Sequence, residues 1–321
     1  MQSKKYLNNA LLMISLPFLS GLVACSSATD TDLIKAENNK AVRRYDISQA
    51  MASNGKVIAV GTQSGAVIVS ADQGRQWQRI ELGNTSLIDM AVCPDGSFVA
   101  IDHYHKVWSS QANAQVWKAS ALAEPQAPIA ITCDFQGNWS VVGSRSTIAK
   151  SVDKGNSWKV FSFDKDTQFT TIQYLNQKDA LVTGEFGMVV VTSDAGETWK
   201  QIAKMPNDFY PYAALFLTRN EGWVSGIAGQ ILHTTDGGNS WVRQNNRTQV
   251  PIYRLFLAEG VPFGVGAEGV ITQYVSGEWR NFRYPDAIPV FLGGGASIPG
   301  QKSLIAGGPA GLLRVIGTNN Q

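Results

Sequence analysis

A tryptophan repeat constrains the fold of this chain more than any other feature of its sequence. Four segments share the pattern Ser/Thr-x-Asp-x-Gly-x-x-Trp, and two eroded copies end at Trp117 and Trp279. The six tryptophans are spaced by 40, 41, 41, 42 and 38 residues, which is the length of a four-stranded propeller blade. The Asp, Gly and Trp of the complete boxes are Asp72, Gly74 and Trp77; Asp153, Gly155 and Trp158; Asp194, Gly196 and Trp199; and Asp236, Gly238 and Trp241.

Each box suits a hairpin turn. The Asp carboxylate can accept backbone N–H groups within the turn, the Gly supplies a positive φ, and the Trp covers the edge of the blade. We therefore interpret the box residues as structural rather than catalytic.

A second hairpin signal precedes each box, in which two apolar strands flank a tight turn. The last copy begins at Gly308 and has no box after it, so we expect a last blade without its outer strand. The sequence predicts an all-β chain folded as a β-propeller of seven four-stranded blades. Because an open ring would leave sheet edges unpaired, a strand within Val42 to Ile47 is expected to close it. Six or eight blades are the alternatives.

The N-terminus has the pattern of an export signal. Lys4 and Lys5 precede an apolar stretch that is too short to span a bilayer comfortably. The segment Leu22-Val23-Ala24-Cys25 resembles a bacterial lipobox, which predicts a signal peptide over 1–24 and lipidation of Cys25; an ordinary cleavage site is the alternative. We expect a tether over 25–40, the propeller over 41–317 and a tail over 318–321. Ser26 favours the outer membrane, on the periplasmic side of the envelope.

The mature chain is close to neutral. Of 27 Lys and Arg against 25 Asp and Glu, two lysines and no acid fall within 1–24, which leaves 25 against 25. A nucleic-acid partner normally demands a basic excess, so none is expected, and the chain is expected to reach the membrane through its lipid anchor. No cofactor is predicted. His103 and His105 flank Tyr104 and His233 lies in another blade, so a structural or solvent-facing histidine pair is favoured over a metal site.

Two cysteines occupy equivalent places in neighbouring repeats, Cys93 and Cys133. A disulfide needs Cα atoms within roughly 7 Å of each other, and neighbouring blades can sit slightly farther apart. We therefore favour two buried thiols, with a disulfide as the alternative that an oxidising compartment permits.

The boxes occur together with Trp-Val-x-Gly motifs, as in Gly222-Trp223-Val224-Ser225-Gly226 and Asn138-Trp139-Ser140-Val141-Val142-Gly143. In these features the chain resembles the photosystem II stability/assembly factor-like family of seven-bladed Asp-box propellers, often exported and sometimes lipid-anchored. The resemblance implies an accessory protein of an envelope membrane complex or transporter. The photosynthetic members are said to use a basic patch, whereas this chain has no arginine run beyond Arg43-Arg44.

The face opposite the boxes is the expected functional surface. The loop that contains Phe209, Tyr210 and Tyr212 is rich in aromatic residues, and clustered aromatic side chains on a loop suit protein recognition. Packing of these rings between blades is the alternative. The partner-binding candidates are Tyr104, Arg145, Phe186, Phe209, Tyr210 and Tyr212.

The leading functional hypothesis is a monomeric, non-catalytic, membrane-tethered scaffold that binds an envelope membrane protein or complex and assists its assembly or operation. A carbohydrate- or small-ligand-binding propeller is the alternative. A sialidase-like glycosidase ranks third, because such an enzyme needs an arginine cluster, a tyrosine nucleophile and an acid/base carboxylate. Phe282-Arg283-Tyr284-Pro285 looks like the element that opens such enzymes, but it lies near the end of the chain.

Overall fold

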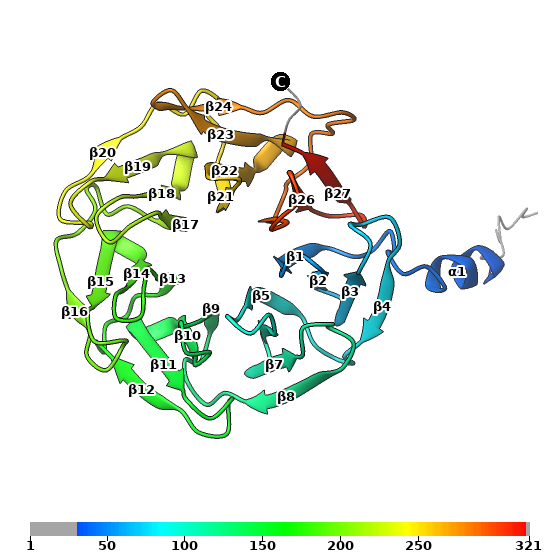
Figure 1. The fold of residues 1–321 in the computed structure, drawn as a ribbon, viewed down its shortest axis with the longest axis horizontal. Coiled ribbons are helices and arrows are strands. Elements are labelled where there is room, and N and C mark those ends of the chain that lie inside the picture. Colours follow the sequence, from blue (N-terminus) through cyan, green and yellow to red (C-terminus); the bar gives the residue numbers. More distant parts are fainter. Residues whose placement is uncertain (1–30, 319–321) are drawn as a thin grey trace, which may run out of the picture.

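The computed structural model describes residues 31–318, which form seven antiparallel sheets arranged in a ring (Figure 1). Six sheets have four strands and the seventh has three. In every sheet the strands are ordered along the chain, from the strand nearest the centre to the strand at the rim. The prediction of a seven-bladed propeller whose last blade lacks its outer strand is confirmed.

Each blade takes about one sequence repeat. The strands of blades 1 to 4 are, in groups of four, β1 (Ser48–Ser53), β2 (Ile58–Thr62), β3 (Ala66–Ser70), β4 (Gln78–Glu81), β5 (Leu87–Val92), β6 (Phe98–Asp102), β7 (Lys106–Ser110), β8 (Trp117–Ala121), β9 (Pro128–Cys133), β10 (Trp139–Gly143), β11 (Thr147–Ser151), β12 (Lys159–Ser162), β13 (Phe169–Tyr174), β14 (Ala180–Gly184), β15 (Met188–Thr192) and β16 (Lys200–Gln201). The strands of blades 5 to 7 are β17 (Pro211–Phe216), β18 (Gly222–Gly226), β19 (Ile231–Thr234), β20 (Val242–Arg243), β21 (Ile252–Ala258), β22 (Val261–Gly266), β23 (Ile271–Val275), β24 (Glu278–Asn281), β25 (Gly294–Ser297), β26 (Ser303–Gly307) and β27 (Leu313–Gly317). Four three-residue turns join second to third strands in blades 3 to 6: η1 (Ser144–Ser146), η2 (Glu185–Gly187), η3 (Ile227–Gly229) and η4 (Ala267–Gly269).

The hydrophobic core lies between the blades. Every residue of the middle strands β2, β6, β10 and β14 is buried, because each blade is covered on both faces by its neighbours. The strands therefore read as continuous apolar runs rather than as an alternating pattern. One core cluster joins Val142 and Ile148 of blade 3 to Phe169 and Val182 of blade 4.

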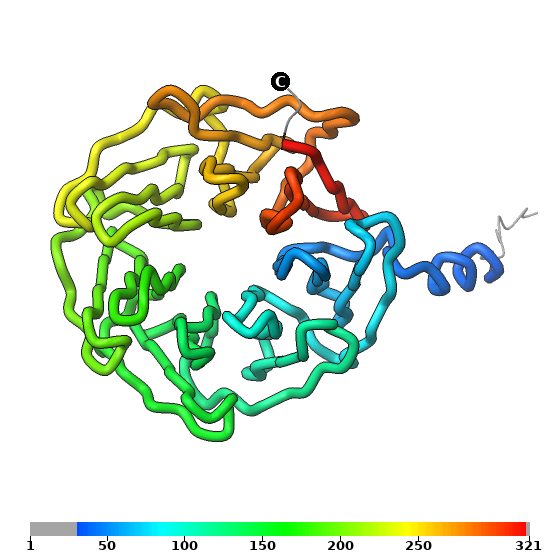
Figure 2. The backbone as a smooth tube through the Cα atoms, in the orientation of Figure 1, coloured from blue at the N-terminus to red at the C-terminus, as the bar shows by residue number. Residues whose placement is uncertain are grey.

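The ring is closed without a shared strand, so the prediction of an N-terminal closing strand within Val42 to Ile47 is wrong. The segment is held instead by Asp46, whose buried carboxylate accepts hydrogen bonds from the Arg43 backbone (2.7 Å), the Ser64 hydroxyl (2.8 Å) and the Arg79 guanidinium (2.9 Å). Its carbonyl oxygen accepts the N–H of Gly311 in blade 7 (2.9 Å). We call this set of contacts the Asp46 clasp. It holds the two ends of the ring side by side (Figure 2).

A disulfide joins Cys93 and Cys133, with their Cα atoms 5.1 Å apart. The interpretation of these residues as two free buried thiols is therefore wrong. Both cysteines lie at the ends of inner strands, where the blades converge on the centre of the ring and neighbouring strands come closer than at the rim (Figure 1). The bridge ties blade 2 to blade 3.

A short helix precedes the propeller, within the segment predicted to be a tether. Helix α1 (Thr31–Asn38) buries none of its residues and projects outward beyond the rim (Figure 1). Lys35 and Asp32, one turn apart, form an ion pair (3.5 Å) that supports it. Within residues 31–318 no helix is long and apolar enough to cross a membrane. The predicted signal peptide and Cys25 lie outside the described residues.

Candidate binding face

The Asp boxes form the turns between the third and fourth strands. In the box of blade 4, the Asp194 carboxylate accepts the Thr192 hydroxyl (2.6 Å) and the Thr198 backbone N–H (2.9 Å), and the Thr192 oxygen accepts the Gly196 N–H (3.0 Å). Burial alone raises the pKa of Asp194, but hydrogen bonds from Thr192 and Thr198 outweigh this effect and lower the pKa to about 2. The same pattern recurs at Asp72, Asp153 and Asp236. These carboxylates are engaged within their own turns, which favours a structural role.

The opposite face carries the turns between second and third strands and the connections from one blade to the next. We call it the non-box face. In blades 3 to 6 the tip of each turn is a residue other than glycine in the left-handed region, with φ of 55–56° at Arg145, Phe186, Ala228 and Glu268. The following residue also has a positive φ, so these are type I′ hairpin turns. The conformation places the tip side chains at the surface.

Five of the six predicted partner-binding residues are at least partly exposed on the non-box face. Tyr104 (53 %) and Phe186 (50 %) are exposed, and Arg145 is exposed and ion-paired with Asp164. Tyr210, in the connection into blade 5, and Tyr212, the second residue of β17, are half-buried.

Phe209 is the exception. It is 3 % exposed and packs in a core cluster with Val189 and Leu232, between blades 4 and 5. Its carbonyl oxygen accepts the N–H of Gly187 (2.7 Å), which anchors the loop against the neighbouring turn. The prediction that Phe209 is a surface recognition residue is therefore wrong: its ring fills the space between two blades.

The first six inner strands share a β-bulge at their second residue. A bulge breaks the pairing register and redirects a side chain. The bulged residues are Gln49, Ile88, Ile129, Thr170, Tyr212 and Tyr253. Four of these bulged residues line one hollow of ≈ 270 Å³: Gln49, Ile88, Tyr212 and Tyr253. The other lining residues are His103, Arg254, Phe291 and Gly293. We call this hollow the channel mouth, because it is formed by the ends of inner strands at the centre of the non-box face.

Aromatic rings form a continuous row along one side of the channel mouth. The ring centroids are 5.7 Å apart between Tyr210 and Tyr212, 5.5 Å between Tyr212 and Tyr253, and 5.8 Å between Tyr253 and Phe291. These spacings are typical of favourable aromatic pairs. The row joins three consecutive blades, and Phe291 is exposed at its end.

A polar pair lies beside the aromatic row. Arg254 of blade 6 reaches across to blade 2, where it lies 3.8 Å from the Asp89 carboxylate and donates to the Ile88 carbonyl (3.4 Å). Asp89 also accepts the Ile131 backbone N–H (3.0 Å). Burial raises the pKa of the Asp89 carboxyl, and the positive charge of Arg254 counteracts that rise. The channel mouth thus offers apolar rings next to a charged pair.

Sequence reasoning missed Tyr253, Arg254 and Phe291. A readable signal existed for Tyr253, since it lies one repeat after Tyr212 at the same place in its blade. His103 lines the channel mouth. In the described part of the chain, no group of three or more His, Cys, Asp or Glu side chains is placed to hold a metal ion.

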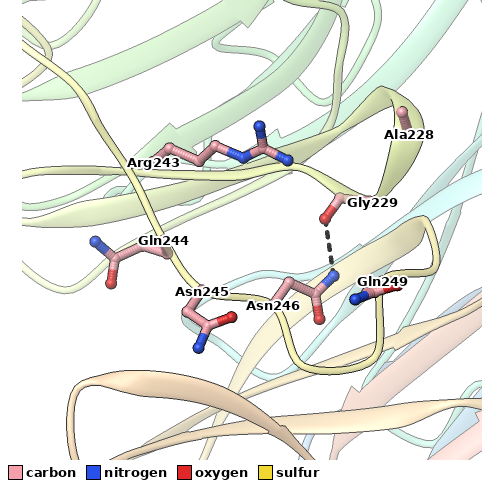
Figure 3. Close-up of a pocket in the computed structure, with 7 residues that line it drawn as sticks. All are labelled: Ala228, Gly229, Arg243, Gln244, Asn245, Asn246 and Gln249. Atoms are coloured by element: carbon pink, nitrogen blue, oxygen red, sulfur yellow. Dashed lines mark hydrogen bonds between the residues drawn. The ribbon is translucent and has the colours of Figure 1, made fainter.

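A second, larger hollow lies beside the turn η3 and the connection that follows β20 (Figure 3). It has a volume of ≈ 600 Å³ and shares no lining residue with the channel mouth. We call it the amide hollow. Its lining residues are Ala228, Gly229, Arg243, Gln244, Asn245, Asn246 and Gln249.

Together these features define the class of the protein as a seven-bladed Asp-box β-propeller. Residues 109–215 match the family model described as "Photosynthesis system II assembly factor YCF48", so the resemblance predicted from the boxes is confirmed over that segment. Comparison with curated protein sequences finds no significant match.

Solved structures support the same fold. YCF48 from Cyanidioschyzon merolae aligns with a TM-score of 0.69 and 15 % identity, over 86 % of this chain and 97 % of that one. A structure titled "YCF48 bound to D1 peptide" aligns with a TM-score of 0.67 and 13 % identity, over 85 % and 94 %. Catalytically inactive virginiamycin B lyase from Staphylococcus aureus, solved with quinupristin, aligns with a TM-score of 0.73 and 13 % identity. The alignment covers 85 % of this chain and 96 % of that one. At these identities the likeness shows the fold alone.

Proposed function

We propose that this chain is a non-catalytic accessory lipoprotein whose non-box face binds a segment of an envelope membrane protein or complex and assists its assembly or operation. The observation that carries the proposal is the channel mouth, where bulges turn Tyr212 and Tyr253 toward one hollow beside Phe291. Interfaces between proteins are enriched in aromatic residues and arginine at their centres.

The surroundings of the channel mouth support a macromolecular partner. Tyr104 and Phe186 are exposed on the same face, in the turns of blades 2 and 4. They widen the surface beyond the ≈ 270 Å³ hollow. A small ligand would contact the hollow alone, whereas a polypeptide segment can contact the hollow and the turn tips together.

The relative titled "YCF48 bound to D1 peptide" supports a polypeptide ligand, since a propeller of the same fold is described there with a bound peptide. The engaged carboxylates of the Asp boxes support a structural use of the opposite face. Neither observation points to a reaction.

The tether is the second part of the proposal. Lipidation of Cys25 would hold the chain on the periplasmic side of the envelope, in the outer membrane. Helix α1 leaves the ring at its rim (Figure 1), so an anchor beyond it leaves both faces of the propeller accessible. Cys25→Ser should release the protein from the membrane fraction and abolish acyl labelling; retention in the membrane after a high-salt wash would contradict the anchor.

Affinity purification from solubilised envelopes tests the binding face. Tyr253→Ala combined with Phe291→Ala should abolish recovery of co-purifying membrane proteins at an almost unchanged melting temperature. The matched control is Phe135→Ala, which truncates an exposed phenylalanine (51 %) in the turn between β9 and β10, on the box side of the ring. Unchanged recovery by the double variant, or equal loss by the control, would contradict the proposal.

A further inference from the structure

We infer that the amide hollow is a separate binding site for a neutral saccharide. It lies where the connection from blade 5 to blade 6, after β20, passes the turn η3 (Figure 3). Its volume of ≈ 600 Å³ falls within the range of roughly 300–1,000 Å³ common for small-molecule sites.

The walls of the hollow are held in place by Asn246. Its amide donates to the carbonyl oxygens of Gly229 (2.8 Å) and Val250 (3.3 Å), and its side-chain oxygen accepts the backbone N–H (3.1 Å) and hydroxyl (2.7 Å) of Thr248. All the hydrogen-bonding capacity of this side chain is engaged within the fold. Asn246 therefore fixes the segment against the turn, so a ligand need not order the site on binding.

The neighbouring side chains keep free hydrogen-bonding groups. Gln244 accepts the Tyr274 hydroxyl (3.4 Å), which leaves its amide N–H groups available. Asn245 donates to Glu278 (3.1 Å), which leaves its oxygen available. The side chains of Arg243 and Gln249 form no hydrogen bond or ion pair with any of the described residues. The hollow thus presents donors and acceptors side by side.

Mixed donors and acceptors match sugar hydroxyls, because each hydroxyl can donate one hydrogen bond and accept two. A strongly anionic ligand is less well matched, since Arg243 is the single cation in the lining. Nearby Arg247 is paired with Glu278 (2.9 Å). A cationic ligand meets no carboxylate in the lining.

An extended peptide fits the hollow poorly. The backbone of the lining segment is already paired with Trp279, which donates to the Asn245 carbonyl (3.1 Å) and accepts the Arg247 N–H (3.0 Å). That stretch of backbone is therefore not free for strand addition. Apart from Ala228, the lining side chains are polar, so the hollow lacks an apolar pocket for a peptide side chain.

The test is saturation-transfer NMR on the full-length protein in a detergent without a sugar headgroup. The probes are N,N′-diacetylchitobiose and maltose, with inorganic phosphate and tri-alanine as comparison ligands. We expect saturable transfer to a disaccharide with a Kd on the order of 1 mM, since the lining offers no ring for stacking. Arg243→Ala and Gln249→Ala should each weaken it by about tenfold, the equivalent of one hydrogen bond of about 1.4 kcal/mol.

Two controls separate this site from other surfaces. Lys200→Ala removes an exposed cation from β16, the outer strand of the adjacent blade 4, and should leave saccharide binding unchanged. Tyr253→Ala alters the channel mouth and should also leave saccharide binding unchanged. Loss of partner binding at the channel mouth can therefore be distinguished from loss of saccharide binding at the amide hollow. Lack of transfer to either disaccharide, unchanged affinity in Arg243→Ala and Gln249→Ala at unchanged melting temperature, or binding of phosphate or tri-alanine alone would overturn the inference.

Discussion

Two phenylalanines that lie close together in the fold should respond very differently to the same substitution. Phe209 is 3 % exposed between blades 4 and 5, whereas Phe186 is 50 % exposed at the tip of the adjoining turn. Truncating a fully buried phenylalanine to alanine costs about 3–5 kcal/mol, because apolar contacts are lost and a cavity remains. The Phe186 ring is only about half buried, so its truncation to alanine should lower the free energy of unfolding by about 1 kcal/mol.

The melting temperature distinguishes the two variants. At about 2–4 °C per kcal/mol for a domain approaching this size, Phe209→Ala should lower it by roughly 6–20 °C and Phe186→Ala by only a few degrees. Circular dichroism against temperature measures both, and partner recovery should show the reverse order, with Phe186→Ala the more affected at permissive temperature. Equal melting temperatures for the two variants would refute the assignment of Phe209 to the core.

Three further predictions concern structural devices in the ring. Asp194→Ala should destabilise the protein by about 1–3 kcal/mol without loss of partner binding at permissive temperature, as measured by urea unfolding at pH 7. Because the pKa of Asp194 is lowered from 3.8 to about 2, its contribution is complete above about pH 4 and is lost as the pH falls toward 2, so variant and parent should converge in acid. Asp46→Ala removes the acceptor shared by Arg43, Ser64 and Arg79 and leaves the Arg79 guanidinium paired with Glu81; it should cost about 1–3 kcal/mol, and an unchanged urea midpoint would contradict the Asp46 clasp. Cys93→Ala combined with Cys133→Ala should cost about 2–4 kcal/mol relative to the oxidised parent, and the unfolded, unreduced parent should resist alkylation at both positions.

The repeat pattern could be read from the sequence because it is local. The spacing of Trp77, Trp117 and their successors places one blade per repeat, and the missing box after Gly308 indicates the three-stranded last blade. These signals depend on neighbouring residues within one hairpin, where sequence and geometry are tightly linked.

The predictions that were wrong concern contacts between blades. Closure depends on the clasp between Asp46 and groups of the first and last blades, and the pairing of Cys93 with Cys133 depends on the narrowing of the ring toward its centre. Loop composition could not separate buried Phe209 from half-buried Tyr212. The channel mouth was missed because bulges set the direction of its side chains, although the repeat spacing of Tyr212 and Tyr253 was visible.

Site-specific photo-crosslinking in intact envelopes tests the central claim most directly. A photoreactive phenylalanine at Phe186 or Phe291 lies on the non-box face, and the same residue at exposed Val116 or Val152 lies on the box face. The account predicts a shared membrane-protein adduct from Phe186 and Phe291 and none from Val116 or Val152. The same adduct from the box face, with none from the non-box face, would contradict it.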